Sequence, residues 1–458
     1  MKKEPKGVEE MMTSISLTEK IGYGLGDLGF NFYWANISSF LLIFYTDTFG
    51  IPAAAAGTMM LVSKIIDAFA DPIIGALGDR TKSRFGNFRP YLLWFGLPLA
   101  AAGVLTYTTP NLTEGGKLIW AYGTFSFMMI AYSLVNIPYS ALAGVISSNS
   151  QERTTLISFR FIGAFTGTII VNYYTLTLVK WFGGSNETLG WQLTMALYGI
   201  VAAIIFIIVF LSTKERVKNP PHQNTTVSVD IKDLLNNRPW IVLFSLALII
   251  MVTITMRAGA TIYYIKYFVN RPDLIKYFLT SYSIALVVGA AITPVLTRFV
   301  DKKRLMVILM SATGILSIGY FFIPKDAIGL LFGINILIGL VLGPKSPLAF
   351  SMYADTADYT EWKTGRRATG LTYAAANFSQ KLGGALASFI IGSVLAAMGY
   401  VANTAQSNAS QMGIVIIISI IPGAFALLAA FVMKFYTLDN KQLATIQSDL
   451  IKRKDHEE

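Results

Sequence analysis

Two aspartates interrupt an apolar stretch that is long enough to cross a bilayer, LVSKIIDAFADPIIGALG at residues 61–78. A carboxylate at the centre of a bilayer costs about 2.5–3.5 kcal/mol on insertion scales. A helix places Asp67 and Asp71 on one face, and Lys64 joins that face from the preceding turn. Such a charged stripe has to face the protein interior or water, and it is typical of a site that binds a transported ion.

The composition places the rest of the chain in a membrane as well. Of the 458 residues, 54% are hydrophobic and 14% are charged, whereas soluble domains carry about 25% charged residues. Hydropathy predicts twelve transmembrane helices of about 20 residues each. We expect them at residues 28–50, 55–78, 90–108, 117–146, 157–181, 190–212, 239–265, 275–297, 304–323, 327–351, 369–398 and 411–435.

Residue counts exclude several classes of site. The chain has no cysteine, which rules out disulfides and thiolate metal sites. His222 and His456 both lie in hydrophilic segments, so imidazole chemistry inside the membrane is excluded. The polar N-terminal segment has no apolar core, and we expect no cleavable signal peptide. The net charge of +11 reflects basic loops on one side of the membrane rather than a nucleic-acid-binding surface.

Basic residues in the loops predict the orientation in the membrane. Lysine and arginine recur in the loops after the second, fourth, sixth, eighth and tenth predicted helices and in the C-terminal tail. The loop after the seventh helix, with Lys266, Arg271 and Lys276, breaks this pattern. By the positive-inside rule, the even-numbered loops and both termini belong in the cytoplasm, and the chain is a multi-pass protein of the cell (inner) membrane.

A long polar segment containing Pro220 and Pro221 separates six predicted helices from six others. The two halves have weakly similar loop sequences: GDRTKSRFGNFR follows the second helix, and TRFVDKKRL follows the eighth. Two related six-helix halves are typical of the major facilitator fold, whose substrate sites lie at mid-membrane between the halves. The predicted division is an N-terminal segment at 1–27, halves at 28–212 and 239–435, a cytoplasmic linker at 213–238 and a tail at 436–458.

Polar residues within the apolar segments indicate binding sites. Asp67 and Asp71 can share a cation or carry a proton, and Lys381 in the eleventh helix needs a carboxylate partner such as this pair. The alternative for the two aspartates is a structural ion pair. Asn31 and Asn136 offer amides that suit sugar hydroxyls, where the alternative is hydrogen bonding between helices.

Aromatic and basic side chains add to the predicted sugar site. An indole stacks well on a pyranose ring, although core packing explains a tryptophan equally well. The basic side chains suit an anionic sugar if they face the cavity, and the alternative is snorkelling near a helix end. The residues are Trp34, Arg160, Arg257 and Lys345.

The loop motif GDRTKSRFGNFRP predicts a cytoplasmic charge network that holds one gate state. The alternative is charge that only sets the topology. Acidic partners are expected from ADTADYTEWKTGRR on the pseudo-equivalent loop. The predicted gating residues are Asp79, Arg80, Arg84, Arg89, Asp355, Asp358 and Arg367.

Seven sequence blocks resemble those of the glycoside–pentoside–hexuronide:cation symporter family, with the closest pattern in its glucuronide- and xyloside-transporting branches. The blocks span nearly the whole chain: KIGYGLGDLGFNFYW, FYTDTFG, KIIDAFADPIIG, DRTKSRFGNFRPYLL, AYSLVNIPYSALAG, MYADTADYTEW and QKLGGALASFIIG. The resemblance implies that Asp67 and Asp71 are cation-site carboxylates. It also implies that Lys381 is the essential lysine of the eleventh helix and that Arg160 is the sugar-site arginine.

Departures from the family pattern refine these expectations. Asn31 and Asn136 stand where melibiose-type members have aspartates that clamp the sugar, which argues against galactosides. Ser133 keeps a hydroxyl at the cation position of the fourth helix. Ala70 stands where Na⁺-using members tend to have asparagine, and one lost oxygen ligand weakens a Na⁺ site more than a proton site. We therefore expect H⁺ rather than Na⁺ as the coupling ion.

The expected function is cation-coupled symport of a pentoside, glucuronide or related glycoside by alternating access. An uncoupled facilitator or exporter of the same fold is the alternative. A membrane-embedded transferase is disfavoured because the chain has no phosphate-binding glycine loop and its acidic residues lie within a span. We expect no enzyme activity, no cofactor, no metal beyond Na⁺, no nucleic acid and no obligatory protein partner. The expected partners are the sugar or glycoside and the lipid bilayer.

Overall fold

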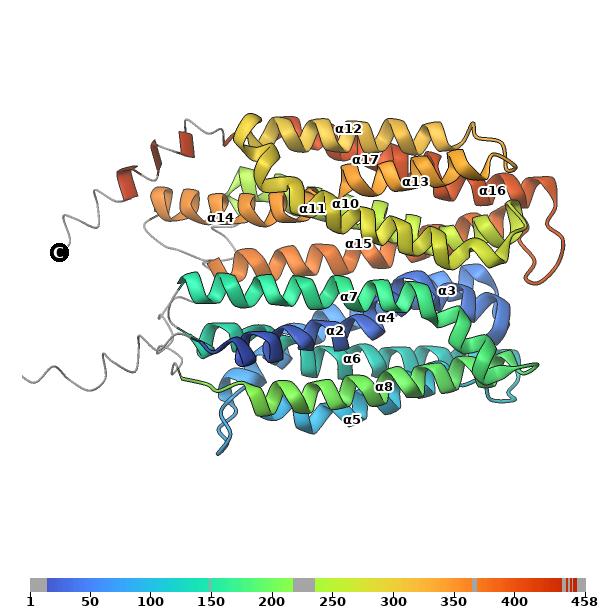
Figure 1. Cartoon of the computed structure of the whole chain (residues 1–458), viewed down its shortest axis with the longest axis horizontal. Helices are drawn as coiled ribbons and strands as arrows, with labels where there is room; N and C mark the ends of the chain where they lie inside the picture. The colour runs from blue at the N-terminus through green and yellow to red at the C-terminus, as the bar shows by residue number, and fades with distance from the viewer. Residues whose placement is uncertain are drawn as a thin grey trace, which may run out of the picture. The chain divides into compact units, whose positions relative to one another are not determined.

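The computed structural model describes residues 15–147, 150–216, 235–364 and 369–438, together with 442–443, 445–446 and 448–450. Within these ranges, the side chains at positions 79, 150, 151, 154 and 369–376 are not described. The regular structure of this part of the chain is helical, which confirms the predicted all-α architecture (Figure 1). The chain forms two compact units, Met1–Pro221 and His222–Glu458, divided within the segment that we predict as a linker.

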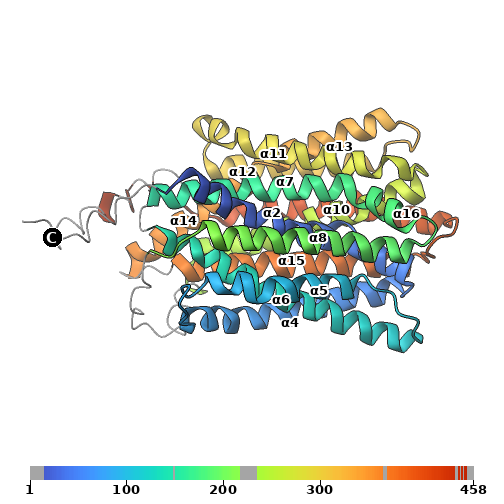
Figure 2. The ribbon, with the colours of Figure 1, turned by 60° about the horizontal axis from the view of Figure 1, so that its bottom comes forward.

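The first unit contains the helices drawn from blue to green in Figure 1. α2 packs mainly on α7 and α8, while α6 lies between α4 and α5, as Figure 2 shows. Ser16 begins α2 by accepting a hydrogen bond from the amide of Glu19 at 3.2 Å. The elements are α2 (Leu17–Ser39), α3 (Leu41–Ile43), the π-helix η1 (Phe44–Phe49), α4 (Ala53–Arg80), α5 (Arg89–Thr106), α6 (Glu114–Ile146), α7 (Ser150–Gly183) and α8 (Glu187–Ser212).

Small residues bring α7 close to α2. A Cβ atom added at Gly163 would lie 2.2 Å from the carbonyl oxygen of Gly24, and one at Gly167 would lie 2.8 Å from that of Leu28. Small residues four positions apart allow two membrane helices to approach at this range. The close packing fixes the register between the helices, and it carries Arg160, one turn before Gly163, to the side of α2.

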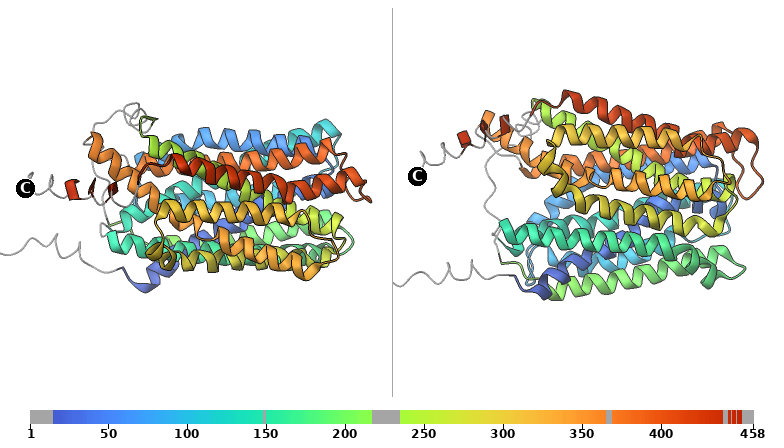
Figure 3. Two further views of the ribbon diagram at one scale, coloured as in Figure 1. Left: turned by 90° about the horizontal axis from the view of Figure 1, so that it is seen from above. Right: turned by 45° about the horizontal axis from the view of Figure 1, so that its top comes forward.

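The second unit is arranged around α10, which packs on α15, α16 and α17. α12 runs along α17, and α11 packs on α13 (Figure 3). A Cβ atom at Gly383 of α15 would lie 2.4 Å from the carbonyl oxygen of Leu248, so this glycine allows α15 to lie against the backbone of α10. The elements are α10 (Arg238–Tyr263), the π-helix η2 (Tyr264–Phe268), η3 (Pro272–Leu274), α11 (Ile275–Phe299), α12 (Lys302–Tyr320), α13 (Ile328–Leu342), α14 (Lys345–Thr364), α15 (Thr369–Ala397), α16 (Asn408–Ile418), α17 (Ile420–Val432) and η4 (Met433–Phe435).

Nine helical stretches of the described residues are long and apolar enough to cross a membrane. α2, α4 and α5, which overlap three of the predicted spans, fall outside this set. The number of twelve spans and the cytoplasmic position of both termini therefore stay predictions. The nine stretches are Glu114–Ile146, Thr155–Gly183, Glu187–Ser212, Arg238–Phe268, Pro272–Phe299, Lys302–Tyr320, Ile328–Thr364, Asn377–Ala397 and Asn408–Phe435.

We predict that Gly163→Ala destabilises the protein, because the added methyl group collides with the backbone of α2. Overpacking of this kind costs about 1–3 kcal/mol. Gly123→Ala on α6 is the matched control, since no atom lies within 4 Å of its added Cβ. Thermal melting of the two purified variants in detergent checks this. Equal melting temperatures would contradict the proposed α2–α7 contact.

Candidate functional site

The charged stripe on α4 faces α6 and α2 in the first unit. Asp67 is fully buried, and one of its carboxylate oxygens accepts a hydrogen bond from the Ser133 hydroxyl of α6 at 2.7 Å. Lys64 is buried as well, and its Nζ lies 5.6 Å from the centre of the Trp34 ring on α2. Asp71 lies half-buried one turn further along α4. The structure thus brings together side chains that the sequence analysis assigned separately to the cation and sugar sites.

A second cluster joins α2, α6 and α7 around Arg160. Its guanidinium pairs with both carboxylate oxygens of Asp27, and the longer of the two contacts measures 3.3 Å. The same guanidinium donates to the Ser140 hydroxyl at 3.3 Å and lies 4.7 Å from the centre of the Tyr139 ring. The side chains of Arg160 and Asp27 keep 21% and 14% of their surface exposed, so the pair remains accessible.

Tyrosines hold this ion pair in place. The Tyr139 hydroxyl donates to the backbone carbonyl of Tyr23 at 2.7 Å, and the Tyr23 hydroxyl donates to that of Tyr139 at 3.1 Å. This reciprocal pair fixes α6 against α2. Sequence analysis missed Asp27 as the partner of Arg160. The Gly163–Gly167 spacing on α7 was the signal for the close helix approach that pairs them.

The predicted sugar-site amides differ in their surroundings. Asn31 donates to the carbonyl of Asp27 at 2.8 Å, and its side-chain oxygen accepts from Thr168 of α7 at 3.0 Å. The first contact lies within α2 and the second joins α2 to α7, while the role of Asn31 in sugar binding stays a prediction. Asn136 is half-buried one turn after Ser133 on α6. The Trp34 ring lies half-buried, with its centre 6.4 Å from that of Tyr132.

Three predicted residues belong to the second unit. Arg257 of α10 is 1% exposed and enclosed by the helices of that unit. Lys345 is half-buried at the start of α14, just after α13 ends at Leu342. Lys381 is half-buried on α15, close to the Gly383 contact with α10. The pairing of Lys381 with the α4 carboxylates stays a prediction.

The predicted gate motif forms an anion site at the start of α5. The Glu215 carboxylate accepts hydrogen bonds from the amides of Asn87, Phe88 and Arg89 at 2.8–2.9 Å. A carboxylate at a helix N-terminus is favoured by the helix dipole. Gly86 has a φ of +108°, and an added Cβ would lie 2.4 Å from the Glu215 carboxylate. The sequence pattern did not point to Glu215, which lies far along the chain.

The end of α8 and the segment that follows it make further hydrogen bonds with neighbouring residues. The Arg89 guanidinium donates to the backbone carbonyl of Phe210. Arg216 donates from both terminal nitrogens to the Glu19 carboxylate, each at 2.8 Å, and these hydrogen bonds raise the pKa of Arg216. Arg89 therefore contacts an acidic residue through its backbone amide, and that residue, Glu215, was not among the predicted gating residues.

The acidic gating residues lie on α14 in the second unit. Asp355 is 6% exposed, and it pairs with Lys302 at the start of α12 at 2.6 Å. Lys302 was not among the predicted residues, because sequence alone does not show which helix ends meet. Asp358 lies half-buried one turn later on α14.

The structure describes the other predicted gating residues only in part. Arg80 and Arg84 are exposed, and the Arg84 guanidinium carbon lies 4.6 Å from the centre of the Phe85 ring. The side chain of Asp79 and the whole of Arg367 lie outside the described residues. A charge network between the two predicted loops stays a prediction.

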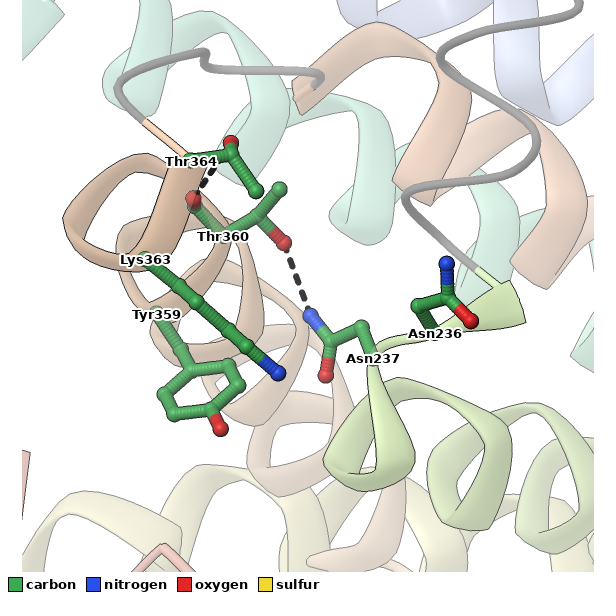
Figure 4. A pocket seen from close by; sticks show the side chains of 6 residues that line it. All are labelled: Asn236, Asn237, Tyr359, Thr360, Lys363 and Thr364. Carbon is green, nitrogen blue, oxygen red and sulfur yellow. Dashed lines mark hydrogen bonds between the residues drawn. The ribbon is translucent and has the colours of Figure 1, made fainter.

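A pocket of about 350 Å³ opens between the start of α10 and the end of α14 (Figure 4). Asn237 donates to the Thr360 hydroxyl at 2.7 Å across it, and its side-chain oxygen begins α10 by accepting from the amide of Trp240 at 3.0 Å. No predicted site residue is among the described residues that line this pocket. Its lining residues are Asn236, Asn237, Tyr359, Thr360, Lys363 and Thr364.

Comparison with known proteins gives close relatives over the whole length. A family model described as "MFS/sugar transport protein" matches residues 22–440. The chain is 36% identical to the inner membrane symporter YicJ of Escherichia coli, with 96% of each chain covered. It is 35% identical to the isoprimeverose transporter of Lactiplantibacillus pentosus, covering 94% of this chain and 91% of that one. A solved D-xylose-proton symporter has a similar fold, with a TM-score of 0.67 at 16% identity over 94% of this chain and 99% of that one.

We predict that Ser133→Ala is more destabilising than Ser126→Ala. Ser133 donates to a buried carboxylate, and losing a hydrogen bond to a charged group costs about 1.5–3 kcal/mol. Ser126, on the same helix, donates to the neutral Ser63 hydroxyl at 2.9 Å, and a neutral hydrogen bond contributes about 0.5–1.5 kcal/mol. Melting temperatures of both variants test this order, and a smaller loss for Ser133→Ala would contradict it.

Proposed function

Because this chain belongs to the MFS/sugar transport protein family, we propose that it is a cation-coupled glycoside symporter that works by alternating access. Family membership makes it a multi-pass transporter of the inner membrane rather than an enzyme. The observation that carries the proposal is the buried contact of Asp67 with Ser133, on an α4 stripe that also carries Lys64 and Asp71. An ordinary structural ion pair needs one carboxylate, and this face of α4 has two.

The charges of the two clusters support coupling to one monovalent cation. Asp67 and Asp71 carry two negative charges on α4, against the single positive charge of Lys64. Among the described residues, the carboxylate that pairs with Arg160 is that of Asp27. Together these five groups have one negative charge more than positive charge, and burial makes an excess charge costly. Binding of one cation at Asp67 and Asp71 removes the excess, with Lys381 as the proposed counter-charge in the empty state.

We favour H⁺ as the coupling ion because of the oxygen atoms that surround the carboxylates. Na⁺ needs several oxygen ligands, whereas a proton needs a single carboxylate oxygen. Ser133 supplies one hydroxyl at Asp67, and Ala70 supplies no side-chain oxygen.

Sodium is the alternative, and one feature of α4 favours it. Pro72 lies inside this helix and has no N–H group, so the carbonyl of Ala68 lacks its usual helical donor. That carbonyl is a neutral oxygen next to Asp67 in the chain, and unpaired backbone carbonyls coordinate Na⁺ in transporters.

The proposed sugar site lies beside the cation site in the first unit. Trp34 faces Lys64 of the α4 stripe, so one side chain adjoins both sites. Arg160 and Asn136 provide hydrogen-bonding groups for sugar hydroxyls, and Asn31 adjoins Arg160 through Asp27. The similarity to an isoprimeverose transporter supports a glycoside or pentoside as the substrate. Lys345 stays a predicted contact from the second unit.

We predict that Asp67→Asn and Asp71→Asn abolish accumulation of the sugar but leave some downhill exchange, because the amide no longer binds the coupling ion. Asp273→Asn is the matched control, since Asp273 lies exposed in the short helix η3 and pairs with Arg271. Uptake and counterflow of a labelled glycoside in proteoliposomes separate the two activities. Concentrative uptake at the normal level in both variants would contradict the proposal. Equal counterflow with and without an ion gradient in the unmodified protein would instead identify an uncoupled facilitator.

The coupling ion is tested by varying Na⁺ and pH independently. We predict that accumulation follows the proton gradient, collapses when a protonophore is added, and changes little with Na⁺ at fixed pH. A steep rise of uptake with Na⁺ at fixed pH would overturn the assignment of H⁺ and favour a site that uses the Ala68 carbonyl. The readout is the initial rate of labelled-glycoside uptake in proteoliposomes.

A further inference from the structure

Arg257 is a buried cation whose contacts are neutral. Its Nη1 donates to the backbone carbonyl of Ile418 at 3.2 Å, and its Nη2 donates to the side-chain oxygen of Asn335 at 3.1 Å. Its guanidinium carbon lies 5.7 Å and 5.5 Å from the ring centres of Tyr282 and Tyr320. Among the described residues, no carboxylate pairs with it. A guanidinium is costly to bury in this way, so its position needs a specific cause.

The carbonyl of Ile418 provides that cause. α16 ends at Ile418 and α17 begins at Ile420, and Pro422 stands four residues after Ile418. In a continuous helix the amide at position 422 would donate to the carbonyl at position 418, but proline has no N–H group. Ile418 is only 1% exposed, so solvent does not replace the missing donor. A buried carbonyl without a donor is itself costly, and Arg257 supplies the hydrogen bond that Pro422 removes.

The same guanidinium connects this break to the rest of the second unit. Asn335 of α13 accepts from Arg257 and donates to the carbonyl of Phe278 on α11 at 3.0 Å. Tyr282 and Tyr320 extend the contacts to α11 and α12. α10, which carries Arg257, also packs on α15 through Gly383, two residues from Lys381. One side chain therefore fixes the break between α16 and α17 relative to the helix that supports Lys381.

We propose that Arg257 is a positioning residue that holds the α16–α17 break by satisfying the Ile418 carbonyl, rather than a ligand for the sugar. This assignment replaces the role in substrate binding expected from the sequence. It stands on the packing of the second unit, and it rests on the proposed function only where transport is the readout. The proposal requires that Arg257 and Pro422 are energetically coupled through the backbone carbonyl of a third residue, Ile418.

A double-mutant cycle tests this coupling. Arg257→Met keeps an unbranched side chain but removes the donor, and Pro422→Ala restores an N–H group for the Ile418 carbonyl. We expect Arg257→Met to lower the melting temperature of the purified protein markedly. In the Pro422→Ala background, Arg257→Met should lower the melting temperature by less than half of the decrease that it causes in the unmodified protein. Equal losses in the two backgrounds would overturn the proposal.

A second cycle supplies the matched control. Pro294 lies inside α11 and removes the helical donor of the Ala290 carbonyl, which Arg257 does not contact. The effects of Arg257→Met and Pro294→Ala on the melting temperature should therefore be additive, and a coupling as large as that with Pro422 would show a general proline effect instead.

If Arg257→Met fails to fold, Arg257→Lys is used in the same cycles. Lysine keeps a donor for one oxygen but not the fork that serves two. Arg257→Lys should lower the melting temperature less than Arg257→Met does, and the decrease should again be smaller in the Pro422→Ala background. An equal decrease with and without Pro422→Ala would count against the proposal.

Transport kinetics separate positioning from sugar binding. The double variant Arg257→Met/Pro422→Ala should keep the KM of Pro422→Ala for the transported glycoside. A KM raised at least tenfold in the double variant, with the melting temperature restored, would assign Arg257 to the sugar site and contradict the proposal. The melting cycle does not depend on transport, so its result stands even if the protein proves not to be a symporter.

Discussion

The cost of burying ionised side chains among apolar helices shapes this protein. Asp67 is fully buried and accepts a hydrogen bond from Ser133, and Lys64 beside it lies over the Trp34 ring. Arg160 is paired with Asp27. Each of these contacts crosses from one helix to another, so the charged groups determine which faces of α2, α4, α6 and α7 meet. The cation proposed to bind at α4 completes this compensation and thereby links ion binding to the packing of the whole unit.

Close helix packing makes these contacts possible. Gly163 lets α7 lie against the backbone of α2, and Arg160, one turn earlier, reaches Asp27 as a result. In the second unit Gly383 has the same effect between α15 and α10. A break between two helices supplies a further polar contact. Pro422 leaves the Ile418 carbonyl without a helical donor, and Arg257 replaces it.

The sequence was most informative where a pattern lies within one helix. The spacing of Lys64, Asp67 and Asp71 predicted the stripe on α4, and the family blocks indicated Ser133 on α6 as its partner. Contacts between distant helix ends were not predictable, because nothing in the local pattern of Asp355 indicates Lys302. Glu215 was missed for the same reason. The sequence predicts Arg257 as a sugar-site residue, and the positioning role that we propose instead depends on the relation of Ile418 to Pro422, which emerges only when the carbonyl and the guanidinium are seen together.

The central claim is that the α4 carboxylates couple cation entry to sugar entry. Its most direct test is the ion movement that sugar causes in weakly buffered proteoliposomes without an imposed gradient. Addition of a transported glycoside should make the external medium more alkaline as protons enter, and Asp67→Asn should abolish this change while sugar still equilibrates. Sugar entry by the unmodified protein with neither a pH change nor uptake of labelled Na⁺ would contradict the account.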